Sequence, residues 1–212
     1  MKRFTGSLAA LAVAATVLAV APATTANAAP KERSLVEVLT SDGNHFDKNK
    51  RDYDIVTEAA LAVVKAKPES PVAVLADGSV RATAFIPNDQ AFRLLLKDLT
   101  GKTVKSEKRI FKRLVKVAGV DTIEQVLLYH VVPGATINSK KALKADGAKL
   151  ETAQGATVKV KVKTPKKNPR IILVDKDRDD RNPRVILKQV DINKGNKQIA
   201  HGIDRVLRPV NL

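Results

Sequence analysis

The segment that decides the fold is Thr83-Ala84-Phe85-Ile86-Pro87-Asn88-Asp89-Gln90-Ala91-Phe92. The apolar residues before Pro87 predict a short strand over residues 80–85. Pro87 fixes φ at the start of a helix, and an Asn or Asp side chain next to it can accept backbone N–H bonds. The segment therefore predicts a strand that passes directly into a helix, with Phe85 and Phe92 facing a core.

Helices are predicted on both sides of this segment from apolar residues at helical spacing. The helix before it begins near Asp52 or Asp54, either of which can cap it, and Pro68 ends it. The helix that begins after Pro87 is closed by Gly101. A further helix covers residues 106–118.

Gly119 stops the helix over residues 106–118, and Asp121 opens the next one. Glu124 follows Asp121 at the spacing of a capping box, in which each side chain binds a backbone N–H of the other residue. That helix ends before Val132-Pro133-Gly134, and a short helix is expected over residues 139–143.

The pattern changes to strands in the last third of the chain. Val158, Val160 and Val162 alternate with lysines, which predicts a strand with one buried and one solvated face. Four short apolar runs follow, at residues 171–174, 185–187, 190–192 and 203–207. Because helices come first and strands later, the fold class expected is a segregated α+β domain. The sequence shows no βαβ repeat and no internal duplication.

The first 28 residues are typical of a secretory signal peptide. Lys2 and Arg3 precede an uncharged stretch from Leu8 to Val20, and Ala26-Asn27-Ala28 has the small-x-small form of a cleavage site. The alternative, an uncleaved anchor, fits less well because the apolar stretch is shorter than the about 20 residues that span a membrane. We expect residues 1–28 to be removed and the protein to be secreted.

After this signal, residues 29–51 are expected to form a loose polar lead-in with one short helix, and residues 52–212 to form one domain. The chain has no Cys, so disulfides, thiolate metal sites and cysteine catalysis are excluded. A domain of about 160 residues is long enough to be held together by its own core.

The net charge of +16 points to anionic partners, and it is still +14 after Lys2 and Arg3 are lost with the signal. Outside a cell these include wall polymers, acidic polysaccharide, anionic lipid and released nucleic acid. Specific reading of nucleic acid is not expected, because aromatic residues make up only 3% of the chain and Trp is absent. The alternative is that the charge only keeps a secreted protein soluble.

One predicted helix, residues 106–118, concentrates this charge. Its basic residues recur every three or four positions, opposite an apolar face, and they form a candidate surface for an anionic polymer. We call the following six residues the basic face: Lys105, Lys108, Arg109, Lys112, Arg113 and Lys116. The alternative is a solvated helix face without a partner. The lysines at 159, 161 and 163 have their own explanation, protection of an exposed strand against edge-to-edge aggregation.

Three segments in a fixed order give the sequence a resemblance to a known family. They are residues 83–92, Leu127-Leu128-Tyr129-His130-Val131-Val132-Pro133-Gly134, and His201-Gly202-Ile203-Asp204-Arg205-Val206-Leu207-Arg208-Pro209. In this order and spacing they resemble the fasciclin (FAS1) domain, over residues 52–212. The chain departs from the family pattern at Asn88, where Thr is usual, and at Lys197, where the family usually has Asn-Gly.

The resemblance implies a FAS1-like wedge of β-sheets with several helices packed around it. It also implies a non-enzymatic domain that binds extracellular matrix or cell-surface components, without a cofactor. Tyr129 and His130 match a region linked to integrin recognition in animal members, and we carry over this position but not the partner. The other matching residues have structural explanations, and they are Thr83, Phe85, Pro87, Asn88, Phe92, His201, Asp204 and Pro209. A histidine flanked by apolar residues, as His130 and His201 are, is more often a hydrogen-bonded core residue than a ligand.

Catalytic and metal motifs are not found in the sequence. It contains three histidines but no Gly-x-Ser-x-Gly elbow and no His-Glu-x-x-His helix. Asp175, Asp177 and Asp179 have the spacing of a calcium loop, but Asp180 and Ile186 stand where an EF-hand needs Gly and Glu. Basic residues alternate with these acids, namely Lys176, Arg178 and Arg181. We therefore expect a solvated, internally neutralised loop and no metal.

Two functional hypotheses remain for a secreted, monomeric protein. The first is adhesion to an extracellular protein around Tyr129 and His130. The second is electrostatic retention at an anionic polysaccharide or cell-wall polymer, which high salt would weaken. A third, binding of a small ligand, requires an apolar pocket that sequence alone does not reveal.

Overall fold

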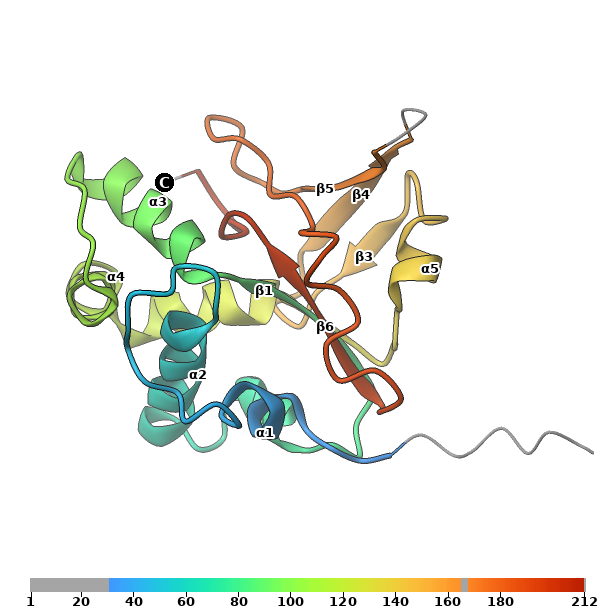
Figure 1. Ribbon diagram of the computed structural model, residues 1–212, viewed down its shortest axis with the longest axis horizontal. Coiled ribbons are helices and arrows are strands. Elements are labelled where there is room, and N and C mark those ends of the chain that lie inside the picture. The colour runs from blue at the N-terminus through green and yellow to red at the C-terminus, as the bar shows by residue number, and fades with distance from the viewer. Residues whose placement is uncertain (1–30, 165–167, 212) are drawn as a thin grey trace, which may run out of the picture.

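The computed structural model describes residues 31–164 and 168–211 (Figure 1). The expected signal peptide, residues 1–28, lies outside the described residues. The first half of the chain is mainly helical, with α1 (Leu35–Leu39), α2 (Asp54–Ala66), η1 (Pro71–Ala76), β1 (Ala82–Pro87), α3 (Asp89–Thr100) and α4 (Glu107–Tyr129). The second half is mainly strands, with β2 (Val131–Pro133), α5 (Ser139–Ala142), β3 (Lys149–Glu151), β4 (Thr157–Lys163), β5 (Arg170–Val174) and β6 (Gln198–Ile203).

Two small sheets organise these elements. The first has the strand order β2-β1-β6, and β1 runs antiparallel to β2 and parallel to β6. Phe85 on β1 lies opposite His201 on β6, so the segments 83–92 and 201–209 are neighbours in one core. The second sheet has the order β3-β4-β5 and is antiparallel throughout. The predicted α+β fold class is confirmed.

The first sheet lies between the helices α1–α4 and the second sheet (Figure 1). Alternate residues of β1 serve two core clusters: Ala84 and Ile86 pack with the helices, whereas Phe85 packs with the second sheet. Every residue of β1 and β6 is buried, so neither strand shows the alternation of polar and apolar residues that reveals a half-exposed strand.

This burial explains most errors in the predicted strands. The last strand covers Gln198–Ile203 and not residues 203–207. The prediction missed its start because Gln198 and His201 are polar, although both are buried. Residues 185–187 and 190–192 contribute only isolated bridges, from Val185 to Ile203 and from Ile192 to Ala200. Two strands, β2 and β3, were not predicted, because three residues are too few to show a period.

The lysine-bearing strand β4 is the centre of its sheet, which corrects the interpretation of its lysines as protection of an edge. Lys159, Lys161 and Lys163 project from the solvated face and are exposed. Lys159 lies directly opposite Lys149 on β3, and Lys163 lies opposite Arg170 on β5. Like charges placed opposite each other repel, so the lysines do not stabilise this sheet.

The lead-in is part of the folded domain instead of a loose segment. It contains the expected short helix, α1, whose Leu35 is buried and donates its backbone N–H to Gln198 Oε1 at 2.9 Å. Lys31 forms a bridge with Asn196 next to β6. A Cβ at Gly78 would lie 1.6 Å from the carbonyl oxygen of Glu32, so only glycine allows the lead-in to pass this turn.

The cap residues expected at two helix starts also differ. Helix α4 contains Gly119 at φ 74° and ψ 166°, which interrupts it as predicted. The chain is helical again from Val120, so Asp121 lies inside the first turn and forms no capping box. Asp121 and Glu124 both bind Lys67 Nζ instead. The start of α2 is capped from another helix, because Asp89 Oδ1 accepts the N–H of Ile55 at 3.0 Å.

Candidate functional site

Tyr129 and His130 end α4 inside the protein. Tyr129 is fully buried and His130 is 4% exposed. The Tyr129 hydroxyl donates to the carbonyl oxygen of Thr157 at 3.2 Å, between the two sheets. This corrects the expectation that the two side chains form a contact surface, because in this structure neither can touch a partner.

His130 connects three parts of the fold. The Leu207 N–H donates to His130 Nε2 at 2.9 Å, so Nε2 carries no proton. The proton is therefore on Nδ1, which donates to the carbonyl oxygen of Val126 at 2.6 Å. The His130 carbonyl oxygen accepts the N–H of Phe85 at 2.9 Å. His130 thus ties the end of α4 to β1 and to the C-terminal segment.

His201 makes the equivalent connection with the opposite tautomer. Its Nδ1 accepts the N–H of Asp191 at 3.3 Å, and its Nε2 donates to the carbonyl oxygen of Ile137 at 2.7 Å. Burial lowers the pKa of His130 to about 4 and also lowers the pKa of His201. Both imidazoles are neutral at pH 7, and both have their ring nitrogens occupied by backbone groups.

Acid is expected to destabilise the protein through His130. Its pKa in the folded state, about 4, lies below the value of about 6.5 expected when unfolded, so the unfolded state binds the proton first. The contribution of His130 to stability is complete above pH 6.5. It falls by about 3 kcal/mol as the pH drops to 4.

Two carboxyls oppose this trend, the buried Asp54 and the half-buried Asp175, because loss of hydration raises the pKa of each to about 6. Protonation of these carboxyls stabilises the folded protein as the pH falls, so the total free energy of unfolding does not isolate the contribution of His130. The decisive measurement is an NMR titration of the His130 ring protons, which should show a neutral ring down to about pH 4. A midpoint near pH 6.5 would contradict the buried, backbone-bonded imidazole.

The other residues of the family segments hold turns and helix ends. Thr83 Oγ1 donates to the carbonyl oxygen of Ala135 and accepts the N–H of Ile137. Asn88 is the N-cap of α3 and accepts the N–H of Ala91, and Asp204 accepts the N–H of Arg184. Of the remaining residues, Phe85, Pro87 and Phe92 are buried and Pro209 is half-buried.

An apolar cavity of about 270 Å³ lies among α2, α3 and α4. Of the described residues that line it, Thr122 and His130 are the only polar ones. Because both nitrogens of His130 are engaged by the backbone, the cavity brings together no acid, base and nucleophile. Its lining suits a small apolar molecule, the kind of pocket that sequence analysis could not detect.

The basic face is the most strongly charged surface feature of α4. All six of its residues are exposed, while Ile110 and Leu114 on the opposite side of the helix are buried. Within the part of the chain that the structure describes, none of the six forms an ion pair; the cations that do are Lys67, Arg93, Lys197, Arg205 and Arg208. Lys105 precedes the helix, which begins at Glu107, and the other five lie on it.

A hollow of about 710 Å³ opens beside this face, at the connection from α3 to α4. Lys105, Arg109 and Arg113 line it together with Lys102, a residue that sequence analysis missed. Lys102 continues the three-residue spacing of the basic face, but Gly101 ends α3 just before it and obscures the pattern. Among the described residues, Ser106, the N-cap of α4, makes no side-chain cap bond there.

The acidic loop at residues 175–180 is neutralised, but by arginines from the C-terminal segment instead of its own basic residues. Arg208 contacts Asp177 at 3.1 Å and Asp180 at 3.2 Å, and its backbone N–H donates to Asp175 at 2.9 Å. Arg205 also pairs with Asp180. These pairs fix the loop to the end of the domain.

Comparison with known proteins agrees with this architecture. Residues 56–209 match the fasciclin domain family, and the chain therefore belongs to that family. Domains of this family are typically non-catalytic and associated with adhesion or binding. No curated protein matches the chain.

Among solved structures, the chain is similar to a FAS1 domain pair from the insect cell adhesion molecule Fasciclin I. The two are 18% identical, the match covers 71% of this chain, and the TM-score is 0.45. The chain spans 44% of that structure's length. Within residues 31–164 and 168–211, no helix has the length and apolar character needed to cross a membrane.

Proposed function

We propose that the protein is a secreted, non-enzymatic binding domain that attaches to anionic polysaccharide through the basic face of α4. The observation that supports this most strongly is six exposed cations on one side of α4 and its leading loop, none of them paired with a described carboxylate. Exposed cations without a partner on the protein remain available to attract a polyanion.

The hollow beside the basic face favours a polymer over a flat membrane surface. Lys102, Lys105, Arg109 and Arg113 surround a concave space, so charged groups of a chain can meet several cations at once. Arginines in this position form paired hydrogen bonds with carboxylate or sulfate oxygens, which lysines alone do not.

Tyr129 and His130 act in this proposal as supports. They anchor the C-terminal end of α4, which the break at Gly119 separates from the basic face, and they do not touch the partner. Adhesion to a specific protein through this pair is the less favoured hypothesis, because both side chains are buried.

Charge reversal tests the proposal. The variant Arg109→Glu/Lys112→Glu/Arg113→Glu should bind polygalacturonate at least tenfold more weakly than the unmodified chain, measured by calorimetry at low ionic strength. Each of the three residues is exposed, so we expect the variant to keep its fold and its thermal midpoint.

The matched control is Lys159→Glu/Lys161→Glu/Lys163→Glu on β4. It changes the net charge by the same amount, on exposed residues of the second sheet. We expect it to keep most of the affinity. Equal losses in both variants would show that only total charge matters, and binding unaffected by salt would also oppose the proposal.

A further inference from the structure

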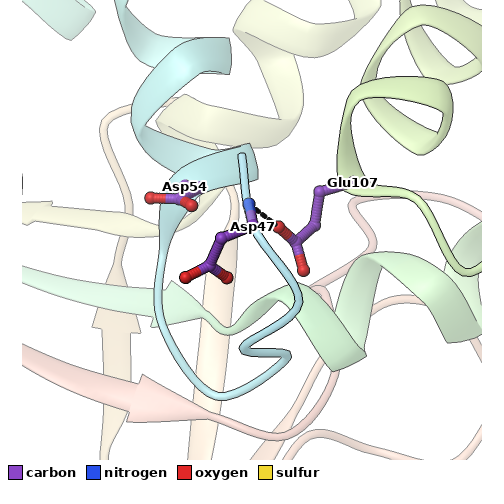
Figure 2. A group of neighbouring side chains, drawn as sticks. All are labelled: Asp47, Asp54 and Glu107. Carbon is purple, nitrogen blue, oxygen red and sulfur yellow. Dashed lines mark hydrogen bonds between the residues drawn. The ribbon is translucent and has the colours of Figure 1, made fainter. Parts of the chain in front are cut away.

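Five carboxylates gather where the first turns of three helices meet, in a chain that is otherwise strongly basic. Asp54 begins α2, Asp89 begins α3 and Glu107 begins α4. Asp47 and Asp52 come from the segment between α1 and α2. Figure 2 shows Asp47, Asp54 and Glu107 on their three segments, with the bond from the Asp47 N–H to Glu107.

The favourable interaction of carboxylates with helix N-termini offsets only part of the cost of this cluster. A carboxylate at a helix N-terminus is stabilised by at most about 2 kcal/mol. Asp89 is fully buried, and Glu107 is 1% exposed. Several carboxylates brought together out of water repel one another and lose hydration.

The partners within the protein are too few to compensate. Arg93 pairs with Glu107 at 2.8 Å and is the one cation that contacts the five carboxylates in the described part of the chain. Two buried oxygens of the cluster, Asp89 Oδ2 and Asp52 Oδ1, find no hydrogen-bond donor among residues 31–164 and 168–211. A buried carboxylate oxygen without a donor or a cation is costly and rare.

The geometry of the inner three carboxylates suits a metal ion. One oxygen from each of Asp52, Asp89 and Glu107 lies within 4.8 Å of the other two. The centre of a triangle of that size is at most about 2.8 Å from each corner. A slight contraction of the three oxygens toward the centre gives the distance of about 2.3–2.6 Å typical of calcium–oxygen bonds. Magnesium requires shorter distances of about 2.0–2.1 Å and a stricter octahedral arrangement.

We propose that Asp52, Asp89 and Glu107 bind one calcium ion at the joined starts of α2, α3 and α4. Asp47 and Asp54 form a second triangle with Glu107 next to this one, and Asp47 is its exposed member. Carboxylates from separate segments around one ion match the oxygen-rich, flexible coordination of calcium. The ion holds the first turn of α4, from which the basic face projects.

A shared proton between Asp52 and Asp89 is the competing explanation for the two oxygens without donors. Burial, followed by its hydrogen bond with Asp52, raises the pKa of Asp89 to about 9. A proton and a calcium ion have different consequences, because only calcium responds to a chelator.

The experiment is a calcium titration of the full chain at pH 7 by calorimetry, paired with thermal unfolding in calcium and in EDTA. We expect one calcium per chain and a midpoint several degrees higher in calcium than in EDTA. Magnesium should give a smaller response at the same concentration.

Two single-charge variants locate the effect. Asp52→Asn keeps the side-chain shape, relieves repulsion and should fold, but it should lose most of the response to calcium. Asp179→Asn removes an exposed carboxylate from the other acidic loop and should keep the full response. Absence of binding at millimolar calcium, or equal midpoints with and without EDTA, would overturn the proposal in favour of a shared proton. An equal loss of the calcium response in Asp179→Asn would place the ion in the acidic loop at residues 175–180 and would contradict the proposed site.

Discussion

Replacement of His130 by Ala is expected to lower the free energy of unfolding by about 4 kcal/mol, one of the two largest losses we expect from a single side chain. A buried ring of this size leaves a cavity worth about 2–5 kcal/mol. The Leu207 N–H and the Val126 carbonyl also lose their partner inside the protein, at a cost of about 1–3 kcal/mol for an unsatisfied group. The ring's links from α4 to the C-terminal segment are then lost, while the backbone bond from the Phe85 N–H to the carbonyl oxygen of residue 130 remains.

Chemical denaturation at pH 7 measures this loss, and His45→Ala is its matched control. His45 is exposed, so its replacement should change stability by less than about 0.5 kcal/mol. If the two variants were equally stable, His130 would not be a structural clamp. A contact role for His130 would predict the reverse pattern, with stability kept and binding lost.

Arg208→Ala is expected to lower the free energy of unfolding by about 4 kcal/mol, because it removes one member of a buried ion pair. The Arg208 side chain is 6% exposed and its guanidinium pairs with Asp177, Asp180 and Asp98, and the Asp177 side chain is 1% exposed. Loss of one member of a buried ion pair leaves the other as an uncompensated charge, which typically costs about 3–5 kcal/mol.

A double-mutant cycle measures the interaction energy between Arg208 and Asp177. Arg208→Ala combined with Asp177→Ala should recover part of the stability, because the stranded carboxylate is removed. Arg178→Ala, an exposed residue of the same loop, should have almost no effect. Strict additivity of Arg208→Ala and Asp177→Ala would contradict the pairing that fixes the acidic loop to the C-terminal segment.

Local chemistry was enough to predict α3 and the helix that carries the basic face. The strand-to-helix passage at Pro87 and Asn88, the left-handed Gly101 and the break at Gly119 were all visible in the sequence. Each depends on a residue with a strong conformational preference: a fixed φ, a side-chain cap or a positive φ. The basic face was visible for a similar reason, since helical spacing shows which residues share a side.

Features that depend on distant contacts were missed or misplaced. The start of β6 was misplaced because Gln198 and His201 are polar but buried, and each is satisfied by backbone groups from elsewhere in the chain. The full burial of Tyr129, a candidate contact residue, was missed for the same reason, since it depends on the second sheet. The carboxylate cluster has no spacing motif, because Asp52, Asp89 and Glu107 meet only when three helices pack.

The most direct test of the account is a map of the bound polymer on the protein by NMR chemical shifts, with polygalacturonate added to the full chain at low salt. We predict that the shifts concentrate on residues 102–116 and disappear as the salt is raised. Shifts centred on the lysines of β4, or on the residues around the apolar cavity, would contradict the assignment of binding to the basic face.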